Sequence, residues 1–371
     1  MDDEIPHPRE IAHLVGQDQA EAELARAFSS GRCPHAWLLT GPKGIGKATL
    51  AYRFARHVLK AGTAETAELD AGAGLFGDDL PAVAPADLSL NPEDPVFRRV
   101  ATGSHADLFV VERAFDEKRG RYRSEIVIDD VRGIGSFFGM TSGEGGWRVV
   151  IVDSADEMNR NAANALLKVL EEPPERCLLL LVSHNPGRLL PTIRSRCRQL
   201  ACKPLDDQVL SAEIARALPD LPEADVTRLA RLADGSLGRA RALSGEGGLE
   251  LFDNLMNLLA SLPRLDATSL QSLTDKLART GQEAAFQTLT ELLAGFLNRL
   301  IIATSGGGTR ATDGREAELI NRLAPEANLE RWLTVWENSR HLFERTTAVN
   351  LDRKQVLLTV FLEVEAAARG S

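Results

Sequence analysis

The sequence predicts an α/β domain built on a parallel sheet, followed by a region made only of helices. Short apolar runs alternate with helical patterns through residues 1–204. A glycine-rich loop joins the first of these runs to the helix that follows it. Residues 205–371 carry apolar side chains at helical spacing. Because parallel strands are joined by crossover helices, we expect a five-stranded sheet with helices on both faces.

The loop after the first strand has the spacing of a P-loop. Residues 36–40 form a short apolar run, and residues 47–59 carry apolar side chains on one helical face. Between them the pattern G-x-x-x-x-G-K runs from Gly41 to Lys47. Its glycines let backbone N–H groups turn toward an anion, and the helix N-terminus adds partial positive charge. The alternative is an ordinary strand–helix turn. The expected nucleotide-binding residues are Gly41, Pro42, Lys43, Gly44, Ile45, Gly46, Lys47, Ala48 and Thr49.

The residue after Lys47 departs from the P-loop pattern. A P-loop has Ser or Thr there because the hydroxyl holds Mg²⁺, and this chain has Ala48. Thr49 does not substitute, because one residue along a helix turns the side chain by about 100°. We therefore expect weak ATP binding at most, and a poor site for Mg²⁺.

Two later strands end in polar residues. The apolar run at 147–153 ends in Asp153, and the run at 177–183 ends in Ser183. An Asp in this position orients Mg²⁺ in P-loop proteins, and the alternative is an acid that starts a helix. Ser154 follows where hydrolytic P-loop proteins have a Glu, and a serine is no general base unaided. Because ligands bind parallel sheets at the carboxyl ends of the strands, we expect these residues to share one site with the P-loop.

The other elements of this domain follow in order. Helices are expected at 18–28, 130–140, 156–172 and 189–195, and strands at 107–111, 147–153, 177–183 and 196–201. Residues 61–95, rich in Ala, Gly, Asp and Pro, predict an exposed and partly disordered insertion. Residues 117–123 predict a charged, hairpin-like excursion.

The rest of the chain predicts helices throughout. Residues 205–245 are expected to form a three-helix lid, with helices at 206–217, 223–233 and 236–243. Residues 246–371 are expected to form a C-terminal domain, with helices at 251–262, 270–277, 284–302, 329–343 and 351–368. A flexible break is expected at 305–314, and His341 is expected to be a surface residue.

Composition limits the class of protein. The chain has 371 residues and a formal net charge of −10, which argues against a free-standing nucleic-acid-binding protein. Aromatic residues make up only 5%, and the sequence shows no base-stacking platform. We expect a cytoplasmic protein that does not contact a membrane, because no apolar run is long enough to span a bilayer. The cysteines form no C-x-x-C pair, so neither a disulfide framework nor a zinc site is expected. They are Cys33, Cys177, Cys197 and Cys202.

Three motifs together carry a resemblance to a known family. The chain contains GPKGIGK, then NAANALLKVLEEPP, then IRSRC, and this combination resembles the bacterial clamp-loader branch of the AAA+ proteins, the subunits that serve DNA polymerase III. Residues 164–174 and 195–197 match the family pattern residue for residue, and the resemblance covers residues 16–243. It implies that Asp153 is Walker-B-like and that Ser183 is sensor-1-like. It also implies that the C-terminal domain forms an oligomer collar.

The resemblance gives Arg196, the Arg of S-R-C, a role as an arginine finger. In the family this residue reaches into the ATP site of a neighbouring subunit, where it stabilises charge on the transferring phosphoryl group. The alternatives are that Arg196 only pairs with a nearby acid, or that Arg194 is the arginine that reaches the neighbouring subunit. The implied partners are the gamma/tau and delta subunits, the sliding clamp and primed DNA. The implied complex is the DNA polymerase III holoenzyme, a DNA-directed DNA polymerase and therefore a nucleotidyltransferase.

The chain also departs from the family. Ala48 lacks the hydroxyl that holds Mg²⁺, and Ser154 stands where the catalytic Glu is expected, so two groups needed for ATP hydrolysis are missing. Arg239 also stands one place later in the sequence than the sensor-2 Arg of hydrolytic members. Family members commonly have four zinc-binding cysteines after the P-loop helix, and residues 58–107 have none, so no zinc is expected. These departures predict a non-hydrolysing stator with little or no ATPase activity. The alternatives are an active gamma/tau-like ATPase, or a scaffold with a vestigial P-loop.

Overall fold

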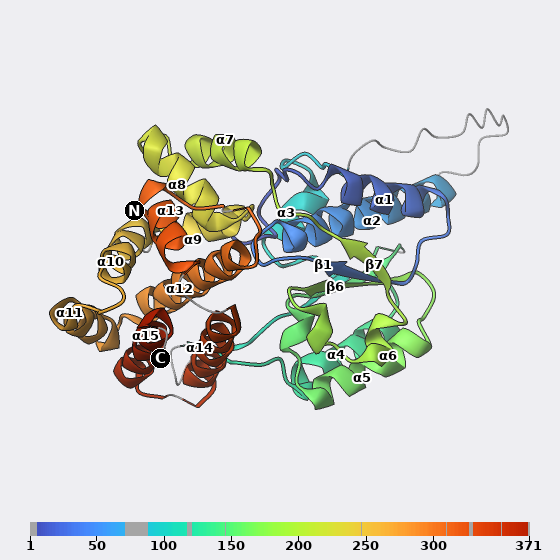
Figure 1. Ribbon diagram of the computed structural model, residues 1–371. Helices are drawn as coiled ribbons and strands as arrows, with labels where there is room; N and C mark the ends of the chain where they lie inside the picture. Colours follow the sequence, from blue (N-terminus) through green and yellow to red (C-terminus); the bar gives the residue numbers. More distant parts are fainter. Residues whose placement is uncertain are drawn as a thin grey trace. The chain divides into compact units, whose positions relative to one another are not determined.

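The computed structural model describes residues 6–70, 88–116, 121–144, 146–245, 247–308, 310–325, 329–349 and 351–369. The chain divides into two compact units, residues 1–205 and residues 206–371. Figure 1 shows a sheet flanked by helices in the first unit and helices in the second.

The first unit contains the parallel sheet that the sequence predicts. Its strand order is β2-β5-β6-β1-β7, and every neighbouring pair is parallel. The strands are β1 (Ala36–Thr40), β2 (Leu108–Val111), β5 (Arg148–Val152), β6 (Cys177–Ser183) and β7 (Arg198–Ala201). The buried β6 lies between β5 and β1, so the carboxyl ends of these three strands are neighbours.

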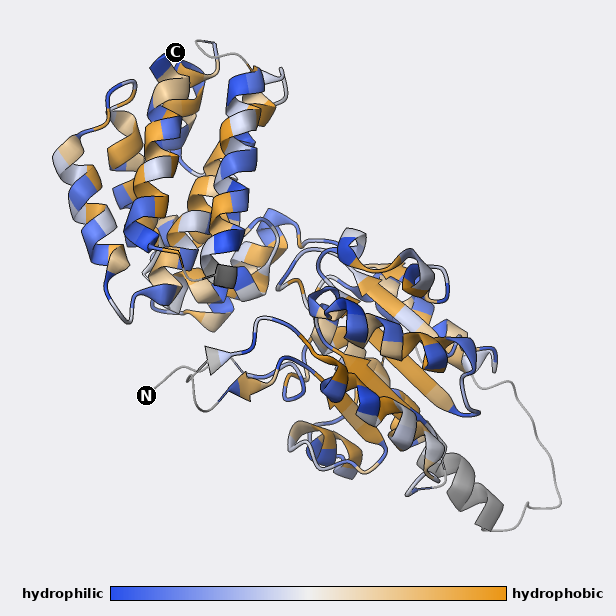
Figure 2. Cartoon of the chain, turned by 90° about the horizontal axis from the view of Figure 1, so that it is seen from below, coloured by the Kyte–Doolittle hydropathy of each residue, from blue (hydrophilic) through white to orange (hydrophobic). Residues whose placement is uncertain are grey.

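Helices cover both faces of this sheet, as predicted. The helices α1 (Asp18–Ser29), α2 (Lys47–Asp70) and α3 (Pro95–Ala101) lie on one face, and α4 (Ile128–Gly139), α5 (Arg160–Glu171) and α6 (Pro191–Arg194) lie on the other (Figure 1). Successive side chains of a strand point to opposite faces. Trp37 and Leu39 therefore join the core under α2, while Ala36 and Leu38 join the core under α5. Figure 2 shows the strands as an apolar layer between helices with hydrophilic outer faces.

The insertion expected at 61–95 is shorter than the sequence suggested. The helix α2 continues to Asp70, and Leu88 is only 1% exposed. Asp94 caps α3, because its side chain accepts a hydrogen bond from the N–H of Val96. Residues 71–87, the middle of the expected insertion, lie outside the described residues.

The predicted start of the helix at 156–172 was wrong. A short 3-10 turn, η1 (Ala155–Glu157), comes first, and α5 begins only at Arg160. The side chain of Asn159 accepts a hydrogen bond from the N–H of Ala162 and so caps α5. The predicted hairpin is present as β3 (Phe115–Asp116) and β4 (Arg121–Tyr122), and it begins before residue 117. Residues 117–120 lie outside the described residues.

The second unit is helical in all its described residues. Its helices are α7 (Asp207–Ala217), α8 (Glu223–Ala233), α9 (Leu237–Gly245), α10 (Gly248–Ala260), α11 (Ala267–Ala278), α12 (Glu283–Thr304), α13 (Gly314–Leu323), α14 (Leu329–Val349) and α15 (Arg353–Arg369). Sequence analysis missed α13. One of its inward positions is Glu316, which interrupts the apolar pattern and pairs with Arg299 at 2.5 Å. His341 is exposed, as expected.

A search of the described residues for membrane spans finds no helix with the length and apolar character needed to cross a bilayer.

A buried ion pair joins α1 to α2 in the first unit. Glu21 accepts hydrogen bonds from Arg53 at 2.6 and 3.1 Å and from the N–H of Leu88 at 2.7 Å. Glu21 and Arg53 are only 6% and 7% exposed. Arg53 also donates to the carbonyl of Ala12 and so holds the N-terminal segment against α2.

We expect Glu21→Ala to lower the free energy of unfolding by about 3–5 kcal/mol, because it leaves the Arg53 guanidinium buried without a counter-charge. Urea unfolding followed by circular dichroism measures the change. The control is Glu23→Ala, which removes an exposed partner of Arg198 and should cost about 1 kcal/mol or less. Equal effects of the two substitutions would contradict this account of the α1–α2 contact.

Candidate nucleotide-binding site

The backbone of the glycine loop requires glycine at particular positions. Thr40, the last residue of β1, is aligned with Ser183, the last residue of β6. Gly41 follows with φ at 142°, and a Cβ there would lie 2.5 Å from the carbonyl oxygen of Cys202. Gly44 and Gly46 also have positive φ, at 77° and 98°. The chain therefore builds a tight turn at the carboxyl ends of the strands, with the backbone conformation that an anion-binding loop requires.

Lys47 bonds to the loop itself. Its ammonium nitrogen donates to the carbonyl oxygens of Gly41, at 2.7 Å, and Pro42. The residue is 2% exposed, and burial lowers the pKa of Lys47 to about 8, although Cys202, Asp153 and Asp156 act in the opposite direction. The lysine thus holds the loop closed on its own carbonyls. A phosphate that entered the loop would have to replace these hydrogen bonds.

Gln17 is a site residue that sequence analysis missed. Its side-chain amide donates to the carbonyl of Ile45 at 3.1 Å and to the carbonyl of Lys203 at 2.8 Å. It is 3% exposed and so ties the P-loop to the segment after β7. The preceding Gly16, with φ at 74°, directs the chain into this contact. A Gly-Gln pair upstream of a P-loop is the signal that could have drawn attention to it.

The end of β5 is joined to the end of β6 by side chains. Asp153 follows β5, and burial, with a smaller effect from Glu112, raises the pKa of Asp153. Ser154 has a left-handed backbone, with φ at 59°, and its Oγ lies 3.1 Å from Nε2 of His184. The Asp156 carboxylate accepts the N–H groups of His184 at 2.8 Å and Asn185 at 3.2 Å. The position expected to hold a catalytic Glu therefore holds a hydroxyl bonded to an imidazole.

Two polar atoms beside this cluster have no hydrogen-bond partner among the described residues. They are Oγ of Ser183, which is fully buried, and Nδ1 of His184. Burial, with a smaller effect from Lys47, lowers the pKa of His184 to about 4, so the imidazole is neutral at pH 7. An unpaired buried hydroxyl is costly unless something binds it. Ser183 is therefore an unpaired hydroxyl beside Thr40, the residue that precedes the glycine loop.

The structure places Arg196 at the amino ends of the strands, whereas the P-loop lies at their carboxyl ends. Arg196 lies just before β7, which begins opposite the start of β1, whereas the P-loop follows the end of β1. At 3.3 Å per residue, about 13 Å of strand separates the two edges. One nitrogen of Arg196 lies 2.8 Å from a Glu171 carboxylate oxygen, and another donates to the carbonyl of Thr192. The side chains of Arg196 and Glu171 are 37% and 50% exposed. The guanidinium therefore faces away from its own P-loop.

Comparison with known proteins shows which proteins the chain resembles. Residues 88–206 match the sequence model of the family described as "DNA polymerase III, delta subunit". The delta' subunit of DNA polymerase III from Pseudomonas aeruginosa is 42% identical over 214 residues, 57% of this chain and 56% of that protein. This chain is a relative of the DNA polymerase III clamp-loader subunits. The resemblance to the DNA polymerase III clamp-loader subunits, inferred from the sequence motifs, is confirmed, and this relative is a delta' subunit.

Other clamp-loader subunits are similar at lower identity. The tau subunit from Escherichia coli is 27% identical over 344 residues, 86% of this chain and 48% of that protein. The chain therefore spans about half the length of the curated relatives it matches. A DNA polymerase III gamma-subunit-related protein from Thermotoga maritima is 20% identical, with 94% of this chain and 100% of that chain covered and a TM-score of 0.36. At that score the likeness carries no conclusion.

Arg239, the displaced sensor-2-like residue of this clamp-loader relative, contacts its own helical unit. A Cβ added to Gly295 of α12 would lie 3.9 Å from a terminal nitrogen of Arg239. Burial lowers the pKa of Arg239, although the nearby carboxylate of Glu291, also on α12, acts in the opposite direction. Arg239 therefore takes part in packing within the second unit.

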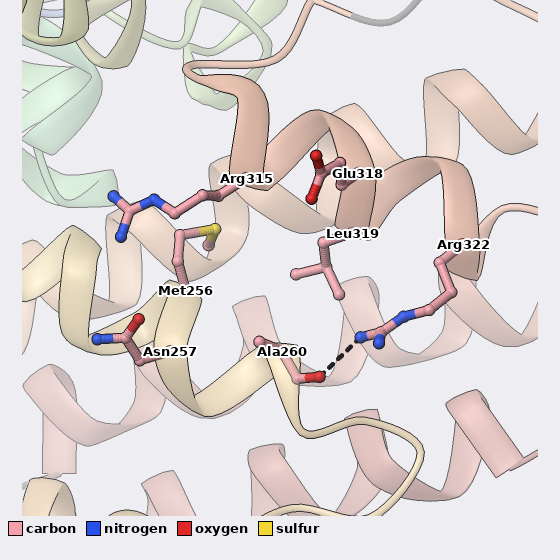
Figure 3. A pocket seen from close by; sticks show the side chains of 7 residues that line it. All are labelled: Met256, Asn257, Ala260, Arg315, Glu318, Leu319 and Arg322. Carbon is pink, nitrogen blue, oxygen red and sulfur yellow. Dashed lines mark hydrogen bonds between the residues drawn. The ribbon is translucent and has the colours of Figure 1, made fainter.

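A hollow of about 310 Å³ lies in the second unit, between α10 and α13 (Figure 3). Arg322 closes one end, where it donates to the carbonyl oxygen of Ala260 at 2.8 Å. Met256 and Leu319 supply apolar lining. None of the site residues predicted from the sequence lines it.

The environment of His184 predicts a pH dependence of stability. The unfolded chain binds a proton on this imidazole near pH 6.5, but the folded chain does so only near pH 4. Below pH 6.5 the unfolded state therefore binds more protons, and stability falls as the pH is lowered toward 4.

We expect His184→Asn, which keeps a hydrogen-bonding group near Ser154, to lose less stability between pH 7 and pH 5 than the wild type. Urea midpoints at the two pH values measure this. The neutral imidazole assigned to His184 is wrong if both proteins lose stability equally.

Proposed function

We propose that this chain is a delta-prime-like, non-hydrolysing stator of the clamp loader that provides Arg196 to the ATP site of a neighbouring subunit. It would act in the cytoplasm with gamma/tau and delta subunits and help to load the sliding clamp on primed DNA for the polymerase holoenzyme. The observation that carries this proposal is the place of Arg196, which is exposed and separated by the length of a strand from its own P-loop.

The P-loop fits a phosphate but fits a metal poorly. Gly41, Gly44 and Gly46 have the positive φ that lets a loop wrap an anion. Ala48 lacks a hydroxyl for Mg²⁺, and the partial burial that raises the pKa of Asp153 disfavours the ionised form that a metal needs. Any bound ATP also has to draw Lys47 from the carbonyls of the loop. We therefore propose weak nucleotide binding without a well-held metal.

The groups that would cleave ATP are absent from their expected places. Ser154 is uncharged at neutral pH, and its hydroxyl is bonded to His184. Attack on a γ-phosphoryl group needs a positioned water, and in this site no carboxylate follows Asp153 directly. Both features support a stator over a motor.

An active gamma/tau-like ATPase is the second candidate. The unpaired Oγ of Ser183 beside the P-loop and the 27% identity to the tau subunit over 86% of the chain favour it. The third candidate is a scaffold with a vestigial P-loop, which the closed position of Lys47 favours.

The proposed role of Arg196 is electrostatic. A guanidinium brought to a neighbour's ATP would stabilise charge that develops on the transferring phosphoryl group. Release from Glu171 costs about 1 kcal/mol or less, because both side chains are exposed. The surface pair therefore holds Arg196 at the edge of the sheet without locking it there.

We expect Arg196→Ala to lower ATP turnover at the neighbouring site of a reconstituted complex by about 10³-fold or more. Total turnover of the complex should then fall by the fraction that this site contributes. Arg196→Lys should fail to restore turnover, because a lysine lacks the planar fork of donors.

The matched control is Arg198→Ala, which removes another exposed arginine from the same edge of the sheet. It should leave turnover unchanged. All variants should assemble with the partner subunits, as measured by size-exclusion chromatography. Normal turnover in an assembled Arg196→Ala complex would remove the arginine-finger role.

A further inference from the structure

We propose that the second unit carries a binding site for a small oxyanion of the phosphate class, formed by Arg239 of α9 and Arg299 of α12 over Gly295. All three residues belong to the same unit. The site goes beyond the proposed function and does not depend on it, because neither the P-loop nor Arg196 contributes to it.

The two guanidinium groups converge on one glycine of α12. A Cβ at Gly295 would lie 3.3 Å from a terminal nitrogen of Arg299 and 3.9 Å from a terminal nitrogen of Arg239. Both nitrogens therefore lie on the side of the helix where a side chain at position 295 would stand. A tetrahedral oxyanion on that side can span the two nitrogens, because each of its oxygens accepts a charge-assisted hydrogen bond at about 2.8 Å.

The glycine keeps this approach open. Gly295 lies in the interior of α12, where glycine is less favourable than alanine because it loses more backbone freedom on folding. A methyl group at this position would press on the nearer guanidinium nitrogen and narrow the space between the two cations. The helix thus gives up some stability at the one point where the two arginines meet.

Arg239 carries a charge that the surrounding residues do not satisfy fully. Its Nε is buried and has no hydrogen-bond partner among the described residues. Burial lowers the pKa of Arg239, the carboxylate of Glu291 opposes this, and the charge of Arg299 lowers the pKa further. A buried cation without enough hydrogen bonds is unfavourable, and an anion that binds beside it removes part of that cost.

The partner of Arg299 leaves one nitrogen of its guanidinium for a ligand. Glu316 is fully buried and accepts hydrogen bonds from Nε of Arg299, at 2.9 Å, and from one terminal nitrogen, at 2.5 Å. The other terminal nitrogen is the one that lies over Gly295. The side chain of Arg299 is only 16% exposed, so the site is recessed and favours a small free anion.

The test follows the thermal unfolding midpoint of the full chain as sodium phosphate replaces sodium chloride at constant ionic strength. A specific site gives a rise that saturates with phosphate concentration, whereas exclusion of the salt from the protein surface gives a rise that does not saturate. We expect Arg239→Gln to raise the apparent dissociation constant for phosphate about tenfold or more, because it removes charge-assisted hydrogen bonds.

A second variant keeps both arginines. Gly295→Ala should raise the midpoint without phosphate, because alanine favours the helix, and should raise the dissociation constant about fivefold or more. Glu291→Gln should tighten binding, because it removes a negative charge near Arg239. The control is Arg241→Gln, which lies two residues along α9 and so on another side of the helix, and it should bind like the wild type.

Phosphate that binds in the P-loop is distinguished by repeating the titration in Lys47→Ala. The proposal predicts that saturable stabilisation persists in Lys47→Ala and is lost when Arg239→Gln is added. It is overturned if Lys47→Ala alone abolishes the effect, or if Arg239→Gln and Gly295→Ala keep the wild-type affinity. Absence of a saturable rise in the wild type overturns it as well. None of these results bears on Arg196, so the proposed function is tested separately.

Discussion

The hydrogen bonds from the ammonium of Lys47 to the carbonyls of Gly41 and Pro42 hold the candidate nucleotide-binding loop closed. The loop has the glycines that an anion-binding loop needs, but the ammonium of Lys47 is hydrogen-bonded to two carbonyl oxygens of the same loop. Gln17 fixes the loop from the other side through Ile45. A ligand must therefore compete with contacts that the fold already makes, and it gains little metal assistance in return.

The parallel sheet separates the two sites that we propose for this chain. All five strands run in one direction, so their carboxyl ends gather the phosphate loop, Asp153 and Ser183 at one edge. At the amino ends of the strands, Arg196 forms an exposed ion pair with Glu171. A side chain at those amino ends is a strand length from the P-loop of its own chain, and the guanidinium of Arg196 is exposed. This geometry is compatible with the proposed role, in which the subunit contributes to a reaction that it does not perform.

Much of this fold could be predicted from the sequence, because buried parallel strands appear as continuous apolar runs. The strands β1 and β6 have the bounds that their apolar residues indicate. The start of α5 was missed because one hydrogen bond to Asn159 outweighs a longer helical pattern, and α13 was missed because Glu316 breaks its apolar face. The contact of Gln17 with Lys203 joins positions that are 186 residues apart, and no local pattern reveals it. Composition likewise showed few aromatic residues but not that two of them, Phe115 and Tyr122, share one exposed hairpin.

The most direct test of the account is steady-state ATP hydrolysis by the isolated full chain in the presence of Mg²⁺. A loop closed by Lys47, with Ala48 and Ser154 in place of the metal-binding hydroxyl and the catalytic carboxylate, predicts no turnover above that of a Lys47→Ala variant. Sustained hydrolysis by the wild type that Lys47→Ala abolishes would contradict the account and make the chain a motor.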